Sequence, residues 1–208
     1  MLNGHTVHEP TVFVVDDDAS VRESLRWMVG SLDLPVETYA TAREFLGAQN
    51  GGRPGCLVLD LRMPEMSGLD LQSELAARHI RLPIIMISGH ADVASAVRAL
   101  KAGALDFLEK PFARSELLAR VQEALALDAK VRQAEAERIR VEGCVARLTP
   151  RERQVMDLVV SGKTNKTIAA ELGLCEKTVE VHRARVMTKM EADSLAHLVR
   201  LAAVERGA

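Results

Sequence analysis

Acidic residues follow two short apolar segments that the sequence predicts to be strands. Asp16, Asp17 and Asp18 come directly after the first segment. Asp60 ends the second. Carboxylate oxygens are ligands that Mg²⁺ prefers, and the ion takes one or two of them while keeping several waters. A carboxylate beside such a cation can attack phosphorus and form an acyl phosphate. The spacing therefore predicts a divalent-cation site that handles a phosphoryl group.

Two further predicted strands end in a hydroxyl and an ammonium group, at Ser88 and Lys110. Lys110 would supply a counter-charge on the opposite side of the site, and Ser88 would donate to a phosphoryl oxygen. Pro111 is expected to fix the backbone there, with a cis peptide as one option. The expected ligands of Mg²⁺, for which Mn²⁺ is a substitute, are the carboxylates of Asp16, Asp17 and Asp60 and the backbone carbonyl of Arg62.

These groups need a parallel sheet to bring them together. Apolar runs typical of buried strands alternate with helical patterns, as in α/β folds. The expected strands lie at 12–15, 36–39, 57–59, 84–87 and 104–108. Five such units predict a flavodoxin-like, doubly wound five-stranded parallel sheet in the order 2-1-3-4-5. In that order four strands are contiguous, so the acidic, hydroxyl and ammonium groups converge at their carboxyl ends.

Helical patterns fill the segments between these strands. One of them is marked by Val93, Val97 and Leu100. A last helix begins near Ser115, and neither glycine nor proline interrupts the strongly helix-forming sequence after it until Gly143. This stretch predicts a helical linker, for which a solvated spacer and a dimer-forming coiled coil both remain open.

A change of pattern after the linker predicts an all-α domain of four helices. Residues 149–152 form a capping box with proline at the first helical position. Gly162 ends that helix, and Gly173 makes the turn between the second helix and the third, which runs from about residue 176 to 190. Helix, glycine turn and helix, with basic residues on the later helix, is typical of a helix-turn-helix DNA-binding module.

The third of these helices carries the side chains expected to bind double-stranded DNA. The small residues Val181 and Ala184 would let it sit deep in the major groove, and Glu180 would accept from a cytosine amino group. Basic and hydroxyl side chains would hold phosphates. A solvated surface helix is the alternative. The expected DNA-binding residues are Lys177, Thr178, Glu180, Val181, His182, Ala184, Arg185 and Lys189.

Composition and charge limit the class of protein. The 208-residue chain is 48% hydrophobic and 3% aromatic, which suits one or two modest helix-rich domains. Residues 1–127 hold 12 basic and 17 acidic side chains, and residues 128–208 hold 15 and 12. An acidic half followed by a basic half suits a cation site joined to a polyanion binder. Three distant cysteines and strand-sized apolar runs predict a cytoplasmic protein without disulfides, zinc, signal peptide or membrane partner.

The first half resembles the receiver domain of two-component response regulators. The resemblance implies that Asp60 accepts the phosphoryl group, that Asp16 and Asp17 bind Mg²⁺, and that Ser88 and Lys110 contact the phosphoryl group. It also makes Phe107 a switch aromatic, for which a plain core role is the alternative. We expect Arg62 and His90 to flank the phosphoryl pocket. The motifs that carry the resemblance lie at 14–18, 60–64, 67–68, 88–90, 102–104 and 110–112.

The segment 148–203 resembles the LuxR-type four-helix DNA-binding domain, whose last helix, the family implies, contributes to dimerisation. The matching motifs lie at 148–152, 165–169, 172–173 and 178–182. Cys175 stands where the family often has a serine cap, so we expect a weakened start of the recognition helix. The helix N-terminus would also lower the pKa of this thiol and make it redox-sensitive, with an inert thiol as the alternative.

The expected domains are a receiver at 11–127, a helical linker at 128–147 and a LuxR-type helix-turn-helix domain at 148–208. The whole chain therefore resembles a transcriptional regulator of the FixJ/NarL family, closest to FixJ. We expect a histidine kinase to phosphorylate Asp60 with Mg²⁺, which switches dimerisation or domain release and so regulates transcription. RNA polymerase is a further candidate partner. Enzymatic activity is expected to stop at self-phosphorylation and self-dephosphorylation.

Two alternatives remain from the sequence. One is a phosphorylation-independent DNA-binding transcription factor whose front domain only dimerises. The other is a haloacid-dehalogenase-like phosphatase, because an aspartate, any residue and a second aspartate follow the first strand at 16–18. That class would use Asp16 as its nucleophile and leaves the second half of the chain without a role.

Overall fold

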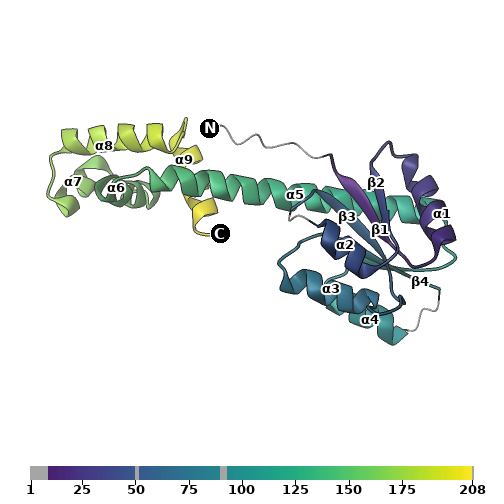
Figure 1. The fold of residues 1–208 in the computed structure, drawn as a ribbon. Helices are drawn as coiled ribbons and strands as arrows, with labels where there is room; N and C mark the ends of the chain where they lie inside the picture. The colour runs from purple at the N-terminus through teal and green to yellow at the C-terminus, as the bar shows by residue number, and fades with distance from the viewer. Residues whose placement is uncertain (1–8, 50–51, 90–92, 208) are drawn as a thin grey trace. The chain divides into compact units, whose positions relative to one another are not determined.

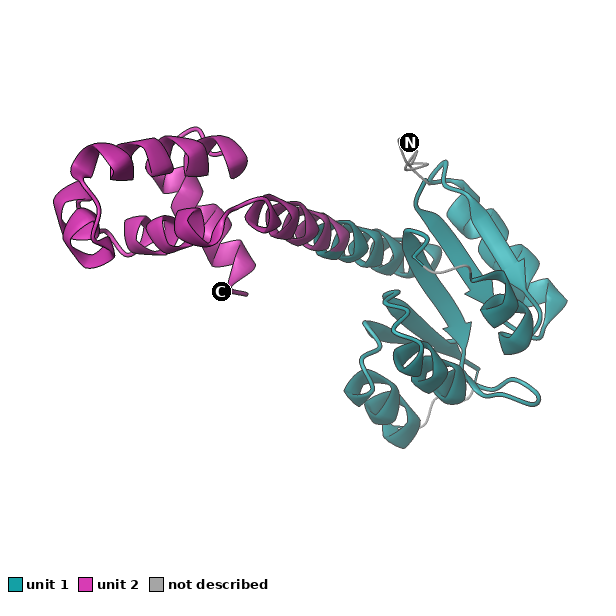
Figure 2. Ribbon diagram, turned by 60° about the vertical axis from the view of Figure 1, so that its left-hand side comes forward, with its two compact units in different colours: residues 1–131 teal, residues 132–208 magenta. Residues whose placement is uncertain are grey.

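The computed structural model describes residues 9–49, 52–89 and 93–207 (Figure 1). The chain divides into two units, with the boundary between Val131 and Arg132 (Figure 2). His90, which was expected beside the phosphoryl pocket, lies outside the described residues. No helix in the described ranges is long and apolar enough to cross a membrane.

The first unit contains a five-stranded parallel sheet in the order β2-β1-β3-β4-β5, which confirms the predicted fold class. Gly103 adopts a φ of 97°, and the N–H of Ala104 donates to Ala99 to close the preceding helix. The last strand therefore begins two residues later than expected. The strands are β1 Thr11–Val15, β2 Val36–Tyr39, β3 Gly55–Asp60, β4 Ile84–Ser88 and β5 Asp106–Glu109.

Helices cover both faces of this sheet. Helices α2, α3 and α4 pack on one face, and α1 and α5 on the other (Figure 1). Helix α2, of 7 residues, was not predicted from the apolar pattern of the sequence. The Lys110–Pro111 peptide is cis. The helices are α1 Ala19–Gly30, α2 Ala42–Ala48, α3 Gly68–Ala77, α4 Val93–Lys101 and α5 Arg114–Ala146.

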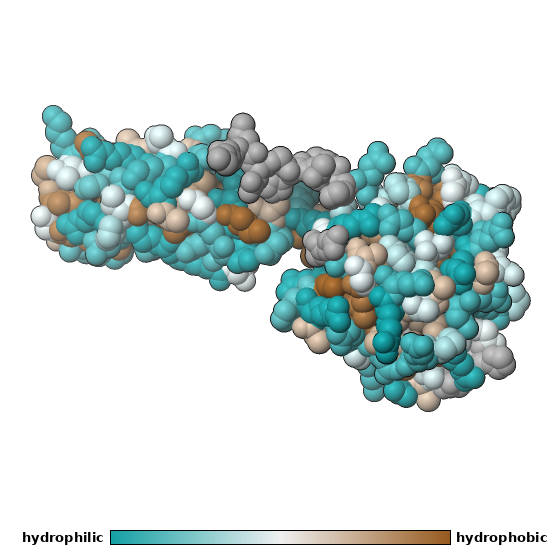
Figure 3. Space-filling view, viewed as in Figure 1, coloured by the Kyte–Doolittle hydropathy of each residue, from teal (hydrophilic) through white to brown (hydrophobic). Residues whose placement is uncertain are grey.

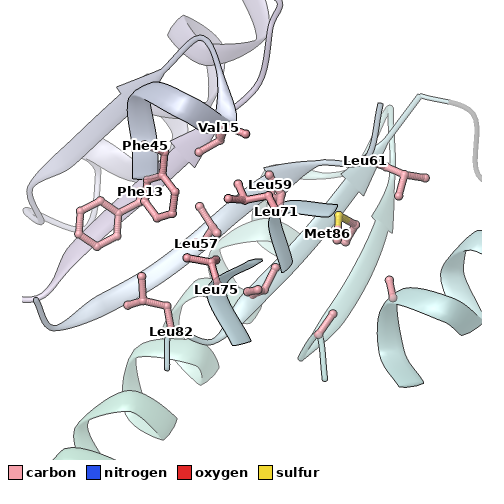
Figure 4. Packing of buried hydrophobic residues seen from close by; sticks show 14 of the residues in the cluster. Phe13, Val15, Phe45, Leu57, Leu59, Leu61, Leu71, Leu75, Leu82 and Met86 are labelled. Atoms are coloured by element: carbon pink, nitrogen blue, oxygen red, sulfur yellow. The ribbon is translucent and has the colours of Figure 1, made fainter. Parts of the chain in front are cut away.

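The core on the α2–α4 face holds the sheet in place under the site. Phe13 on β1 and Phe45 on α2 meet edge to face, with ring centroids 5.8 Å apart (Figure 4). Leu57, Leu71 and Leu75 are buried beside them. Because these side chains are 1% exposed or less, the free energy of burial is close to its full value of about 2 kcal/mol each.

The helix predicted from Val93, Val97 and Leu100 is present as α4, but these apolar side chains do not face the core. Val93, Val97 and Leu100 are 82%, 41% and 45% exposed, and Ala99 makes the buried contact. The buried side chain of Gln72, from α3, donates to the carbonyl of Ala99 at 3.1 Å. This hydrogen bond and the small side chain of Ala99 form the contact between α3 and α4. The larger apolar side chains of α4 remain on the surface.

Helix α5 runs without interruption through Gly143 and crosses the boundary between the units. Leu127, Val131 and Ile139 are exposed along its middle. Arg138 pairs with glutamates three residues before it and four residues after it. Such charge pairs between successive turns stabilise exposed helices, and the solvated spacer and the dimer-forming coiled coil both stay open for this segment.

The second unit contains the four predicted helices. Thr149 and Glu152 form the predicted capping box at the start of α6. Gly173 ends α7 in the left-handed conformation, with a φ of 63°. Val141, from the last turns of α5, lies in the same core as α6, α7, α8 and α9. These helices are α6 Pro150–Val160, α7 Asn165–Leu172, α8 Glu176–Lys189 and α9 Leu195–Glu205.

Candidate phosphoryl site and DNA-binding helix

One ammonium group joins two carboxylates at the carboxyl edge of the sheet. Lys110 Nζ donates to Asp16 Oδ2 and to Asp60 Oδ1, each at 2.6 Å. Both carboxylates are buried. The N–H of Lys110 also donates to the carbonyl of Ser88 at 2.8 Å, which places the ends of β4 and β5 side by side. The structure thus brings together the groups that the sequence predicted at four strand ends.

The loops around these groups are held by their own backbone. Asp60 Oδ2 accepts from the N–H of Arg62 at 2.7 Å, so the backbone that follows β3 borders the acidic pocket. Asp18 caps α1 by accepting from the N–H of Ser20. Ser88 is buried at the end of β4. Phe107 on β5 is half-buried and packs against the core on the α2–α4 face.

Burial and pairing shift the ionisation of this site. Burial raises the pKa of Asp16 above its usual 3.8, and this outweighs the hydrogen bond from Lys110. Burial alone would lower the pKa of Lys110, but its hydrogen bonds with Asp16 and Asp60 raise it above 10.5. Lys110 is therefore charged at neutral pH, and the ionised carboxylate of Asp16 costs the folded state free energy.

The donor set suits a small hard cation such as Mg²⁺. Asp16 and Asp60 supply buried carboxylates that one lysine only partly neutralises, and Asp17 is exposed beside them. The described residues contain no group of three or more His, Cys, Asp or Glu side chains already placed to hold a metal. Mg²⁺ needs only one or two carboxylates because it keeps several waters, so this arrangement fits.

Replacing Asp16 with asparagine is expected to stabilise the metal-free protein. A raised pKa in the folded state means that stability is greatest below the unfolded pKa and is lost as the pH rises through the folded one. The neutral amide removes that loss, so in EDTA at neutral pH the melting temperature should rise by roughly 2–4 °C. Mg²⁺ should stabilise the wild type but not Asp16→Asn. An equal or lower melting temperature of the variant in EDTA would contradict this.

Most of the predicted DNA-binding side chains lie on the exposed face of α8. Lys177, Glu180, Ala184 and Arg185 are exposed, and Val181 is 45% exposed. In the described part of the chain Lys177 and Arg185 form no ion pair. The buried residues of α8 are Val179 and Val186. The helix thus offers two unpaired cations and a small apolar surface between them, as phosphate contacts and groove entry require.

Three of the predicted DNA-binding residues of α8 are half-buried instead of exposed. Lys189 donates to the buried carboxylate of Glu152 at 2.6 Å, so its ammonium is bound within the unit rather than directed to a phosphate. His182 is half-buried, and its Nδ1 is enclosed without a hydrogen-bond partner among the described residues. Thr178 lies 3.1 Å from the sulfur of Cys175. Periodicity alone does not reveal the ion pair of Lys189, because that pair depends on where α6 packs.

Cys175 is the N-cap of α8 and makes no side-chain hydrogen bond to the helix backbone, which confirms the predicted weak cap. The hydroxyl of Thr178 lowers the pKa of this thiol. Thr149, Thr164 and Ser194 all cap their helices by such a bond.

Replacing Cys175 with serine should supply the missing cap and stabilise the protein by about 1 kcal/mol. Thermal unfolding of the full chain, followed by its helical signal, measures this gain. Cys175→Ala, which removes the sulfur without adding an acceptor, is the matched control and should show no gain. A serine variant no more stable than the alanine variant would contradict the expectation.

Both halves of the chain match known protein families. A response regulator receiver domain matches residues 12–122, and the bacterial regulatory proteins of the LuxR family match residues 146–202. These matches confirm the two resemblances drawn from the motifs.

Similar proteins span nearly the whole chain. Nodulation protein W of Bradyrhizobium diazoefficiens is 48% identical over 200 residues, which is 95% of this chain and 88% of that protein. Transcriptional regulatory protein FixJ of Azorhizobium caulinodans is 48% identical, over 92% and 90% of the two chains. The solved structure of response regulator StyR has 48% identity and a TM-score of 0.85, covering 93% of this chain and 98% of that one. Full-length FixJ from B. japonicum has 41% identity and a TM-score of 0.60, covering 97% and 99%.

Proposed function

Because the chain belongs to the FixJ/NarL-type response regulators and is a DNA-binding regulator of a two-component system, we propose that phosphorylation of Asp60 by a histidine kinase switches it. The observation that carries this proposal is the ammonium of Lys110 between Asp16 and Asp60. The family consists of transcription regulators. Self-phosphorylation and self-dephosphorylation are the only reactions that we propose for this protein.

Phosphoryl transfer needs a carboxylate nucleophile whose charge is offset as phosphate oxygens approach. A carboxylate oxygen of Asp60 attacks phosphorus, the bond from phosphorus to the imidazole nitrogen of the kinase breaks, and the imidazole keeps that electron pair. Lys110 then pairs with a phosphoryl oxygen, and the hydroxyl of Ser88 donates to another. Asp16, Asp17, Asp60 and the carbonyl of Arg62 would hold Mg²⁺ or Mn²⁺, which neutralises charge on the transferred group when bound.

The steps that follow phosphorylation, dimerisation and DNA binding, would use exposed surfaces of the chain. We propose that engagement of Ser88 shifts Phe107 and alters the surface around α4, so that the apolar residues already exposed on this helix bind a second copy of the chain. Paired recognition helices would then bind two half-sites on promoter DNA, with RNA polymerase as a further partner. The receiver would extend over 11–127, the linker over 128–147 and the DNA-binding domain over 148–208. The cytoplasm is the proposed location, because the proposed target is promoter DNA.

A groove beside Lys110 is the surface we propose for the kinase. It measures about 280 Å³, and mostly apolar side chains line it. Trp27 on α1 is 71% exposed next to this lining, with the guanidinium of Arg114 5.0 Å from its ring centroid. A large exposed aromatic is the type of side chain that contributes most to binding energy at protein interfaces. The groove is lined by Ser20, Val21, Ser24, Leu25, Met28, Lys110, Pro111 and Phe112.

Replacing Trp27 with alanine is expected to slow phosphoryl transfer from the kinase about tenfold, since loss of an interface aromatic costs roughly 1.4 kcal/mol or more. Phosphorylation by acetyl phosphate, which needs no protein contact, should stay at the wild-type rate. Ile139→Ala removes a similarly exposed apolar side chain from α5 and should change neither rate. Equal kinase rates for Trp27→Ala and Ile139→Ala would refute this docking surface.

The proposed chemistry is tested by intact mass after incubation with acetyl phosphate and Mg²⁺. A single labile phosphoryl adduct should appear with Mg²⁺ or Mn²⁺ and disappear with EDTA. An adduct of the same size in EDTA would refute the metal requirement. No adduct from acetyl phosphate or from a phosphorylated kinase would favour the phosphorylation-independent transcription factor.

A further inference from the structure

Arg22 holds the backbone of the acidic loop that follows β1. It lies near the start of α1 and is half-buried. Its Nη1 donates to the carbonyl oxygen of Asp16 at 2.7 Å. Sequence analysis assigned it no role, because an arginine in the first turns of a helix is usually a solvated surface residue.

Asp16 does not depend on Arg22 for the placement of its side chain. Its Oδ2 accepts from Lys110, and its Oδ1 accepts from the N–H of Asp18 at 2.9 Å. Its own N–H donates to the carbonyl of Tyr39 on β2 at 3.3 Å. The carboxylate of Asp16 is therefore held by two hydrogen bonds and its backbone by a third, so the bond from Arg22 to its carbonyl oxygen must act elsewhere.

The side chain of Asp17 has no such support. It is exposed, and within the described ranges it makes no hydrogen bond and no ion pair. The peptide that joins Asp16 to Asp17 is planar, so the orientation of its carbonyl oxygen fixes where the nitrogen and Cα of Asp17 lie. The oxygen of this peptide is the atom that Arg22 binds. Arg22 therefore holds the backbone unit from which the side chain of Asp17 projects.

We propose that Arg22 is a positioning residue for the divalent cation and that it acts by holding Asp17 toward the pocket of Asp16 and Asp60. This inference rests on the proposed metal site and deepens it. The charge of Arg22 works in the opposite direction, because a cation beside a metal site repels the metal. Electrostatics alone thus predicts that losing Arg22 tightens Mg²⁺ binding, whereas positioning predicts that it weakens binding.

The sign of the change in Mg²⁺ affinity is the test. Calorimetric titration of the full chain with Mg²⁺, without a phosphodonor, is compared for the wild type and Arg22→Met, which keeps an unbranched side chain without donor or charge. We expect roughly tenfold weaker binding by the variant, as for other groups that orient a ligand of a metal. The rate of phosphorylation by acetyl phosphate should return to the wild-type value once Mg²⁺ saturates.

Arg26→Met is the matched control, because Arg26 lies one turn further along α1 and donates to the hydroxyl of Thr38 instead, at 2.7 Å. It removes the same charge and should leave the Mg²⁺ affinity at or slightly above that of the wild type. If Arg22→Met unfolds in EDTA, Arg22→Leu, which also lacks a donor and a charge, takes its place under the same criterion of sign.

Binding by the Arg22 variant that equals or exceeds wild-type binding would overturn the inference, as would a slow phosphorylation rate that persists at saturating Mg²⁺. A wild type that binds no Mg²⁺ would overturn the proposed metal site itself, and with it this role of Arg22. The two failures are distinct, because the first leaves wild-type binding intact.

Discussion

Asp60→Asn is expected to abolish the phosphoryl adduct formed with acetyl phosphate and Mg²⁺. The amide has no carboxylate oxygen to attack phosphorus, and no other described carboxylate shares both the Lys110 contact and the position at the end of β3. The same variant should leave promoter binding at its unphosphorylated value under all conditions. Intact mass and promoter-driven transcription measure the two effects.

The control for this substitution is Glu65→Gln. Glu65 lies in the loop after β3, is exposed, and pairs with Arg43 rather than with the lysine of the site. Its amide variant should acquire the adduct as the wild type does. If Asp60→Asn still carries a labile phosphoryl group while Glu65→Gln behaves normally, another residue is the acceptor and the proposed chemistry is wrong.

The second large effect is expected at the recognition helix. Arg185 is exposed on α8, and within the described ranges it has no acidic partner. A guanidinium free of internal pairing can neutralise a phosphate and release counterions on binding. Arg185→Ala should therefore weaken promoter binding about tenfold and reduce the slope of log affinity against log salt by about 1. Salt titration of DNA binding by the phosphorylated full chain provides both values.

Arg200→Ala is the control for this loss of charge. Arg200 is exposed on α9, and its replacement removes the same charge from a different helix. If the two variants lose affinity equally, the effect comes from the net charge of the unit and not from α8. Lys189→Ala is a further comparison, because Lys189 pairs with the buried Glu152. It should reduce the stability of the unit and leave the salt slope of DNA binding near that of the wild type.

The sequence was sufficient for the sheet and for the groups at its edge. Parallel strands in the predicted order end at Asp60, Ser88 and next to Lys110, and that order brings the three residues together. The capping box at Thr149 was equally predictable, because a local hydrogen-bond pattern with a fixed spacing defines it.

Tertiary contacts explain what the sequence left out. The spacing of Val97 and Leu100 suits a core face, but Ala99 and Gln72 make the contact with α3, and no periodicity distinguishes the two arrangements. Lys189 looks like a phosphate contact until α6 places Glu152 beside it. Arg22 gave no signal at all, because its partner is a backbone oxygen.

Phosphorylation of Asp60 is proposed to raise the affinity of the full chain for promoter DNA. Moving the chain from 1:99 to 99:1 in favour of its active form requires about 5.5 kcal/mol of differential stabilisation. The most direct measurement is a DNA titration of one preparation before and after treatment with acetyl phosphate and Mg²⁺, with Asp60→Asn alongside. We expect the affinity for promoter DNA to rise in the wild type and to stay unchanged in Asp60→Asn. Equal affinity before and after treatment, in wild type that carries the adduct, would contradict it.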